Sequence, residues 1–127
     1  MVKENEIYEC ELCGNVVSVI EAHQGELVCC GQPMNLLEEK TIEKEGNEKH
    51  VPVIEIEGNN VIVKVGSVEH PMEGAHHIQL IQLIKNDNVV MGKRLKPGDE
   101  PEVSFFVKDI NGLKARALCN IHGLWKS

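Results

Sequence analysis

The chain has 127 residues, which is enough for one ordinary domain or two small ones. Its formal net charge of −7 argues against nucleic acid or an anionic membrane as a partner, because their phosphates would be repelled. Neither the opening residues nor any later segment has an apolar run of signal-peptide or membrane-spanning length. We therefore expect a cytoplasmic protein. Its five cysteines then suggest metal ligands or reactive thiols before disulfides.

Residues 1–37 contain two cysteine pairs, the C-x-x-C of Cys10 and Cys13 and the adjacent pair Cys29 and Cys30. Four thiolates form a closed tetrahedral set for zinc or iron, and so short a region needs such a metal to hold its fold. Adjacent residues cannot both take relaxed tetrahedral directions, so we expect a distorted site. The spacing leaves iron and zinc open as alternatives.

Residues 38–49 are charged at eight of twelve positions and indicate a solvated connector. From residue 50 onward, alternating apolar residues and turn signals predict a mostly β region. One hairpin is expected over 53–65, and a long apolar run over 76–90 turns at residues 86–88. Residues 102–119 predict another hairpin. Short strands without a helical period indicate a small β-sandwich or barrel.

A second group of possible metal ligands lies in this β region. Cys119 and His122 form a C-x-x-H, while His50, His70 and His76 stand at predicted loop–strand junctions. Junctions at one end of a sandwich could bring these side chains together as a second metal site. The alternative is that each histidine is an ordinary surface or core residue.

Two other histidines are not expected to be ligands. His77 points away from His76 if the strand is regular, and His23 lies in a turn that should be exposed. In the last predicted strand, Cys119 continues the apolar face and should point inward.

These motifs resemble a known family. The stretch "YECELCGN…LVCCGQPM" resembles desulforedoxin, and "EKHVP", "EHPM…H" and "CNIHGLW" resemble the catalytic domain of superoxide reductases. In this order they resemble a two-iron desulfoferrodoxin, and the likeness covers essentially the whole chain. It implies a desulforedoxin-like domain over 1–37, a linker over 38–49 and an immunoglobulin-like β-sandwich or barrel over 50–127.

The resemblance also implies two iron sites. The first is a rubredoxin-like iron held by four thiolates, and the second has four equatorial imidazoles, an axial thiolate and two neighbouring charged residues beside its open face. The first set is Cys10, Cys13, Cys29 and Cys30; the second is His50, His70, His76 and His122 with Cys119, beside Glu48 and Lys49. Without the resemblance, Glu48 and Lys49 would only be the end of a charged linker.

The implied activity is one-electron reduction of superoxide to hydrogen peroxide without release of dioxygen. Five protein ligands leave one vacancy on an iron that favours six, and one thiolate leaves a ferrous centre with a formal charge of about +1. Such a centre attracts a small anion, and Lys49 would strengthen the attraction. The resemblance further implies that Glu48 fills the vacancy in the ferric state and that rubredoxin donates electrons. We also expect a homodimer, because so small an amino-terminal unit gains stability by pairing.

Other functions remain open from the sequence. An iron electron carrier without substrate chemistry would not bind small anions at its metal. A zinc-stabilised interaction module would be colourless. A dismutase is a nearer rival, because it would use the same substrate at the same metal.

Overall fold

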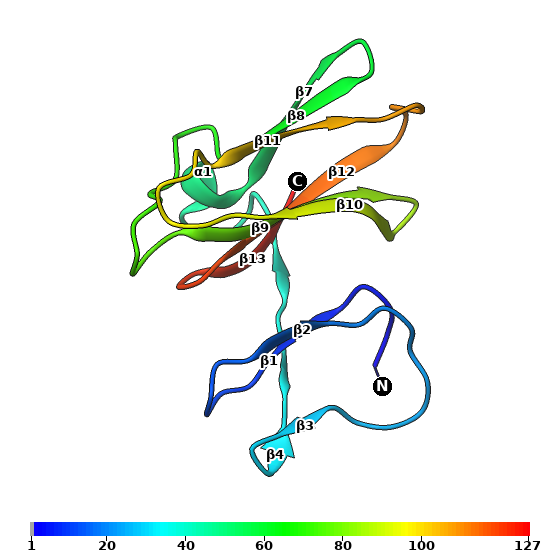
Figure 1. Ribbon diagram of the computed structural model, residues 1–127, viewed down its shortest axis with the longest axis vertical. Helices are drawn as coiled ribbons and strands as arrows, with labels where there is room; N and C mark the ends of the chain where they lie inside the picture. The colour runs from blue at the N-terminus through cyan, green and yellow to red at the C-terminus, as the bar shows by residue number, and fades with distance from the viewer. Residues whose placement is uncertain (1) are drawn as a thin grey trace. The chain divides into compact units, whose positions relative to one another are not determined.

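The computed structural model describes residues 2–127 and separates into two compact units (Figure 1). The first unit ends at Glu38, and the second unit runs from Glu39 to Ser127. Strands make up nearly all of the regular structure, and the one helix among the described residues is four residues long. The prediction of a mostly β chain is therefore confirmed. Within residues 2–127, no helix is long and apolar enough to cross a membrane.

The first unit consists of short strands around a few buried side chains. A three-stranded antiparallel sheet has the order β2-β1-β5, and β3 pairs with β4 as a separate two-stranded ribbon. Its strands are β1 (Ile7–Glu9), β2 (Val16–Ser18), β3 (Val28–Cys29), β4 (Gln32–Pro33) and β5 (Asn35–Leu36). Among residues 2–38, only Ile7, Tyr8, Cys10 and Val19 are buried, so the apolar core is small. A unit of this size gains much from a bound metal.

The second unit is a sandwich of two sheets. The larger sheet has the order β10-β9-β12-β13-β6, and the smaller has the order β11-β8-β7. The elements are β6 (Glu39–Lys40), α1 (Asn47–His50), β7 (Pro52–Glu57), β8 (Asn60–Val65), β9 (Ile78–Lys85), β10 (Asn88–Arg94), β11 (Glu102–Phe106), β12 (Leu113–Cys119) and β13 (Gly123–Lys126).

The core of this sandwich lies between the two sheets. Alternate residues of β8 point inward, and its valines meet inward side chains from β9 and β12. The central members are Val61, Val63, Val65, Ile81, Leu83, Ala115 and Ala117. Cys119 belongs to the same cluster and is 1% exposed. Its predicted inward orientation is confirmed.

Two of the expected hairpins are present. β7 and β8 pair with Glu57 opposite Asn60, so a two-residue turn joins them. β9 and β10 pair with Lys85 opposite Asn88, and the turn residues Asn86 and Asp87 both have left-handed backbone angles. Asparagine and aspartate tolerate that conformation better than most residues, which explains why the turn forms there.

The prediction of a hairpin over 102–119 is wrong. β11 pairs with β8 in the smaller sheet, whereas β12 pairs with β9 and β13 in the larger one. The side-chain amide of Asn59 donates to the carbonyl of Val107 at 2.9 Å, and the Val107 amide donates back to the Asn59 carbonyl at 2.8 Å. These bonds hold the end of β11 beside the β7–β8 turn. The chain then crosses to the other sheet.

The charged segment 38–49 begins inside the larger sheet. β6 pairs in parallel with β13, placing Glu39 opposite Leu124 and Lys40 opposite Trp125. Glu39 accepts a hydrogen bond at 3.1 Å from Arg116, a residue only 3% exposed. A buried guanidinium needs such a partner, so the charge of Glu39 favours docking onto the sheet over a solvated connector.

Candidate metal centres

The four cysteines of the first unit converge on one point. Their sulfur atoms lie within 4.8 Å of one another, and Cys13 and Cys29 are 3.6 Å apart. Four sulfurs around a single ion at metal–sulfur distances of about 2.3 Å require separations of this size. All five cysteines of the chain are free thiols, so no disulfide competes for these ligands. We call this group the four-cysteine centre.

The adjacent cysteines reach the same point because the chain turns between them. Cys29 ends β3, while Cys30 has a φ of 54° in the left-handed region. Consecutive side chains of an extended strand point to opposite faces. The turn at Cys30 removes that alternation and lets both thiols face one ion.

Contacts within the group shift the pKa values of its thiols in opposite directions. The backbone amide of Cys13 approaches Cys10 Sγ at 3.5 Å and lowers the pKa of Cys10 to about 7. Contacts with the thiols of Cys13 and Cys10 raise the pKa of Cys29 to about 12. One thiolate forms readily, but a second one beside it needs positive charge. The four-sulfur donor set fits iron or zinc.

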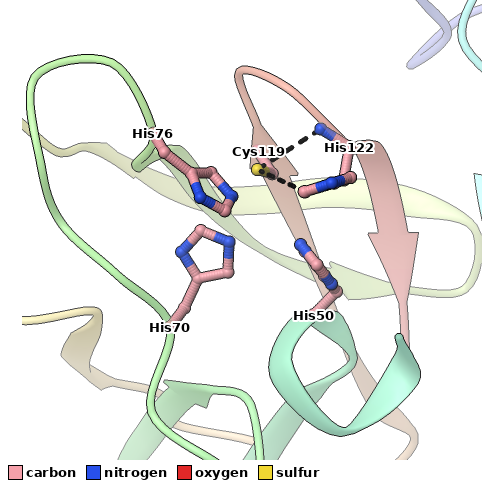
Figure 2. Close-up of side chains that lie close together, drawn as sticks. All are labelled: His50, His70, His76, Cys119 and His122. Carbon is pink, nitrogen blue, oxygen red and sulfur yellow. Dashed lines mark hydrogen bonds between the residues drawn. The ribbon is translucent and has the colours of Figure 1, made fainter.

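The second unit gathers five ligand atoms from three separate segments (Figure 2). His50 ends α1, His70 and His76 lie in the connection between β8 and β9, and Cys119 and His122 flank the turn between β12 and β13. Their candidate ligand atoms all lie within 4.8 Å of one another. The predicted constellation is therefore brought together, and we call it the histidine–cysteine centre.

The four imidazoles stand at the corners of a near-square. Ring centroids of neighbouring histidines are 4.7–4.9 Å apart, and the measured diagonal from His50 to His76 is 6.5 Å. Neighbouring rings are inclined at 66–80° to each other. Four nitrogen donors in a square with one sulfur donor suit a transition metal with five protein ligands.

Hydrogen bonds fix which nitrogen faces the centre. His50 Nδ1 donates to the Gly46 carbonyl at 2.8 Å, and His70 Nδ1 donates to the Pro71 carbonyl at 2.7 Å. The Nε2 atoms of His50, His70 and His76 are buried without a hydrogen-bond partner. Buried polar atoms are normally paired, so three unpartnered nitrogens at one point fit a metal ion as their common partner.

Burial keeps the two innermost imidazoles neutral. His50 is 5% exposed and His70 is 2% exposed. Removal from water lowers the pKa of both rings, and that of His70 falls to about 4. A neutral imidazole keeps a lone pair for a metal, so the fold prepares these rings as ligands.

The thiol of Cys119 is stabilised as a sulfur donor by its own turn. The backbone amide of His122 donates to Cys119 Sγ at 3.4 Å, and His122 Nδ1 lies 3.8 Å from the same sulfur. Cys119 is buried, whereas His122 is exposed. Solvent therefore reaches the ligand set at His122.

The position of His50 depends on the close approach of another segment. A Cβ added at Gly66 would lie 2.7 Å from the carbonyl oxygen of Glu48 and 2.9 Å from the carbonyl carbon of Lys49. The same Glu48 oxygen accepts hydrogen bonds from the Val68 amide at 2.8 Å and the Ser67 hydroxyl at 3.2 Å. Only glycine at position 66 leaves room for α1 to sit against this segment.

Sequence reasoning missed a supporting layer around the centre. Trp125 stacks on His50 with ring centroids 4.8 Å apart, and its indole N–H donates to the His122 carbonyl at 3.0 Å. Lys40 donates to that carbonyl at 2.9 Å and lies over the Trp125 ring at 5.4 Å. The single tryptophan of the chain, three residues after His122, was the available signal.

The remaining predicted residues have simpler surroundings. Glu48 and Lys49 are exposed on α1 and directly precede His50. His77 is outside the ligand group, as expected. His23 is exposed, as expected, and lies 3.2 Å from Glu21.

Comparison with known proteins covers both units. The desulfoferrodoxin amino-terminal domain matches residues 2–37, and the desulfoferrodoxin family matches residues 42–127. A desulfoferrodoxin homolog from Archaeoglobus fulgidus is 58% identical over 127 residues, covering 100% of this chain and 99% of the relative. A desulfoferrodoxin from Syntrophotalea carbinolica is 55% identical over 128 residues, covering 100% and 98%.

A solved structure gives the same result for the fold. The superoxide reductase from Treponema pallidum superposes with a TM-score of 0.77 at 29% identity, covering 96% of each chain. Two donor sets, one of four sulfurs and one of four imidazoles with a sulfur, match the two iron sites of that fold family. The chain belongs to the desulfoferrodoxin family.

Proposed function

We propose that this protein is a superoxide reductase, which converts superoxide, one electron and two protons into hydrogen peroxide and releases no dioxygen. The observation that carries the proposal is the donor set of the histidine–cysteine centre. Five protein ligands leave one position on an iron that favours six, whereas the four-cysteine centre is complete. The similar protein from Treponema pallidum is a superoxide reductase.

The proposal assigns a role to each ligand group. His50, His70, His76, His122 and Cys119 hold the catalytic iron, which supplies the single electron to the substrate when bound. Cys10, Cys13, Cys29 and Cys30 hold the other iron, which stabilises the first unit. The burial that keeps His50 and His70 neutral leaves one ligand charge, that of Cys119, to set against the ferrous ion.

Charge explains how an acidic protein draws in an anion. The chain as a whole carries −7, but a ferrous ion with one thiolate has a formal charge of about +1. We propose that Lys49, exposed and next to His50, adds to this local field and orders the water that protonates the product. Glu48, its neighbour, would supply a carboxylate oxygen as a further ligand to the oxidised iron.

The remaining parts of the proposal concern partners and organisation. Residues 1–37 form the desulforedoxin-like domain, 38–49 join it to the catalytic domain over 50–127, and the protein works as a cytoplasmic homodimer. A rubredoxin or similar carrier returns the electron. Neither nucleic acid nor a membrane is expected as a partner.

The test is a count of products. The fully reduced protein receives a measured dose of superoxide without air, and hydrogen peroxide and dioxygen are both quantified. One peroxide per superoxide without dioxygen supports the proposal. Half a peroxide with matching dioxygen, formed faster than in buffer, would indicate a dismutase. A rate equal to that in buffer would contradict both and leave a carrier or a zinc module.

A further inference from the structure

The residue after Cys119 makes hydrogen bonds on both sides of His76. The side-chain oxygen of Asn120 accepts from the His77 amide at 2.9 Å, and its side-chain nitrogen donates to the Ala75 carbonyl at 3.0 Å. The Asn120 amide also donates to the His77 carbonyl at 3.2 Å. Asn120, the residue after the ligand Cys119, therefore makes three hydrogen bonds to the two residues on either side of the ligand His76.

His76 needs such an anchor because it lies in the long connection between β8 and β9. This connection supplies two of the four imidazoles, and it is tied to β8 by a bond of 3.0 Å from the His70 amide to the Val65 carbonyl. Near its other end, Glu73 and His76 pair in a short bridge. That bridge shapes the loop, and the pairing of Ile78 with Cys119 ties the start of β9 to β12, but His76 itself lies outside this ladder.

We propose that Asn120 is a positioning residue for the iron, setting the distance between His76 and Cys119 through its carboxamide. The two ligands lie on different segments, so their separation depends on contacts between the segments. Asn120 is joined to Cys119 by one peptide bond, and the residues bonded to it flank His76 directly. Mutation of a residue that hydrogen-bonds next to a metal ligand typically lowers metal affinity by about 10- to 100-fold. This inference needs an iron at the centre but does not need superoxide as the substrate.

The chain offers a matched control in Asn59. Its side-chain amide also makes two hydrogen bonds across segments, to the carbonyls of Val107 at 2.9 Å and Lys108 at 3.1 Å. Asn59 lies in the turn at the start of β8, and Gly66 beside α1 follows its end. The six residues of β8 lie between Asn59 and Gly66 and place them about 20 Å apart. Asn59→Ala should therefore lower the thermal stability of the protein without changing how the histidine–cysteine centre holds iron.

The experiment measures iron retention in the full-length protein with both sites loaded. A ferrous chelator is added to the wild type, Asn120→Ala and Asn59→Ala, and iron release from the histidine–cysteine centre is followed over time. The thermal transition of each variant reports stability separately. We expect Asn120→Ala to release this iron at least tenfold faster, with an altered ferric spectrum. Asn59→Ala should stay within twofold of the wild type.

Equal release rates from Asn120→Ala and Asn59→Ala, with unchanged spectra, would overturn the proposal and leave Asn120 a structural residue. Asn120→Asp provides a variant of nearly the same shape in case the alanine protein does not fold. Its carboxylate can still accept from His77 but faces the Ala75 carbonyl with a second oxygen. It should also lose iron faster than the wild type. Wild-type retention there would contradict the role given to the Ala75 contact.

If the product count fails to show superoxide reduction while Asn120→Ala still loses iron faster, the positioning role stands without the proposed function. If superoxide reduction is confirmed and Asn120→Ala retains iron normally, the positioning role alone is wrong. The two ideas are thus separable.

Discussion

The two metal centres share a local device and differ in what surrounds it. In each, the backbone amide three residues along donates to a cysteine sulfur: from Cys13 to Cys10 at 3.5 Å and from His122 to Cys119 at 3.4 Å. The four-cysteine centre draws all its ligands from two short turns of one small unit. The histidine–cysteine centre draws them from three segments of a sandwich. The same type of turn therefore occurs both in a closed site of four thiolates and in a site of five ligands that leaves one position open.

The two centres also differ in how many of their ligands are buried. In the four-cysteine centre Cys10 alone is buried, whereas in the histidine–cysteine centre Cys119, His50 and His70 are buried and His122 is exposed. A site that only holds the fold can lie at the surface, because four thiolates leave no position for a substrate. A site with one open position benefits from rigid ligands held in a core.

The largest expected effect comes from removing the only sulfur of the reactive centre. Cys119→Ser should abolish the thiolate-to-iron absorption of that centre and slow superoxide reduction by more than about 100-fold. Loss of a ligand should exceed the loss of a partner one step further out. Absorption spectra and the rate of superoxide loss measure both effects. An unchanged band would remove Cys119 from the ligand set.

Removing one sulfur from the four-cysteine centre should lower stability but leave superoxide reduction almost unchanged. Cys13→Ser should remove the iron of the four-cysteine centre and lower the thermal stability of the first unit, because its core is small. With a chemical reductant as donor, the rate of superoxide reduction should stay within about twofold of the wild type. Metal content, calorimetry and that rate test the contrast. A loss of activity as large as in Cys119→Ser would show that the centres do not divide the work as described.

An intermediate effect is expected from Gly66→Ala. The added carbon would lie 2.7 Å from the Glu48 carbonyl oxygen, so α1 and His50 must move. Overpacking of this kind costs about 1–3 kcal/mol of stability. Iron should be lost more easily from the histidine–cysteine centre and not from the four-cysteine centre. Gly74→Ala is the control, because nothing lies within 4 Å of a Cβ at Gly74. Equal iron retention in both variants would contradict this role of Gly66.

The smallest effect should be that of Lys49→Ala. Removing an exposed positive charge beside His50 should slow the second-order reaction with superoxide by about tenfold and weaken its dependence on salt. Lys93→Ala, which removes an exposed lysine of β10, should change the rate much less. Stopped-flow or pulsed-radical measurements at two ionic strengths provide the comparison. Equal rates for the two variants would return Lys49 to the role of an ordinary surface charge.

The residue types and spacings predicted the four-cysteine group and a possible second site, and the family resemblance completed the ligand set of the histidine–cysteine centre. It also predicted the β7–β8 and β9–β10 hairpins, whose turns contain residues suited to left-handed angles. The pairing of β11 with β8 could not be predicted, since alternation marks a strand but not its neighbour. The pairing of Glu39 with Arg116 could not be predicted either, because the sequence does not show which distant residues become neighbours. Charges that pair across 77 residues look like solvated charges in sequence.

The contacts made by the supporting residues around the histidine–cysteine centre could not be predicted, although the single tryptophan near His122 was a signal in the sequence. Trp125 and Asn120 gain their roles from segments that meet only in the folded chain. Nothing in the spacing of His50 and Trp125 says that their rings stack.

The most direct test of the division between the centres is to follow both irons after one addition of superoxide. The fully reduced protein is mixed with less than one equivalent, and the absorption of each ferric centre is recorded in time. We expect the thiolate band of the histidine–cysteine centre to appear first, in step with peroxide formation, while the four-cysteine centre is still reduced. Oxidation of the four-cysteine centre first, or of both at one rate with no delay, would contradict the account.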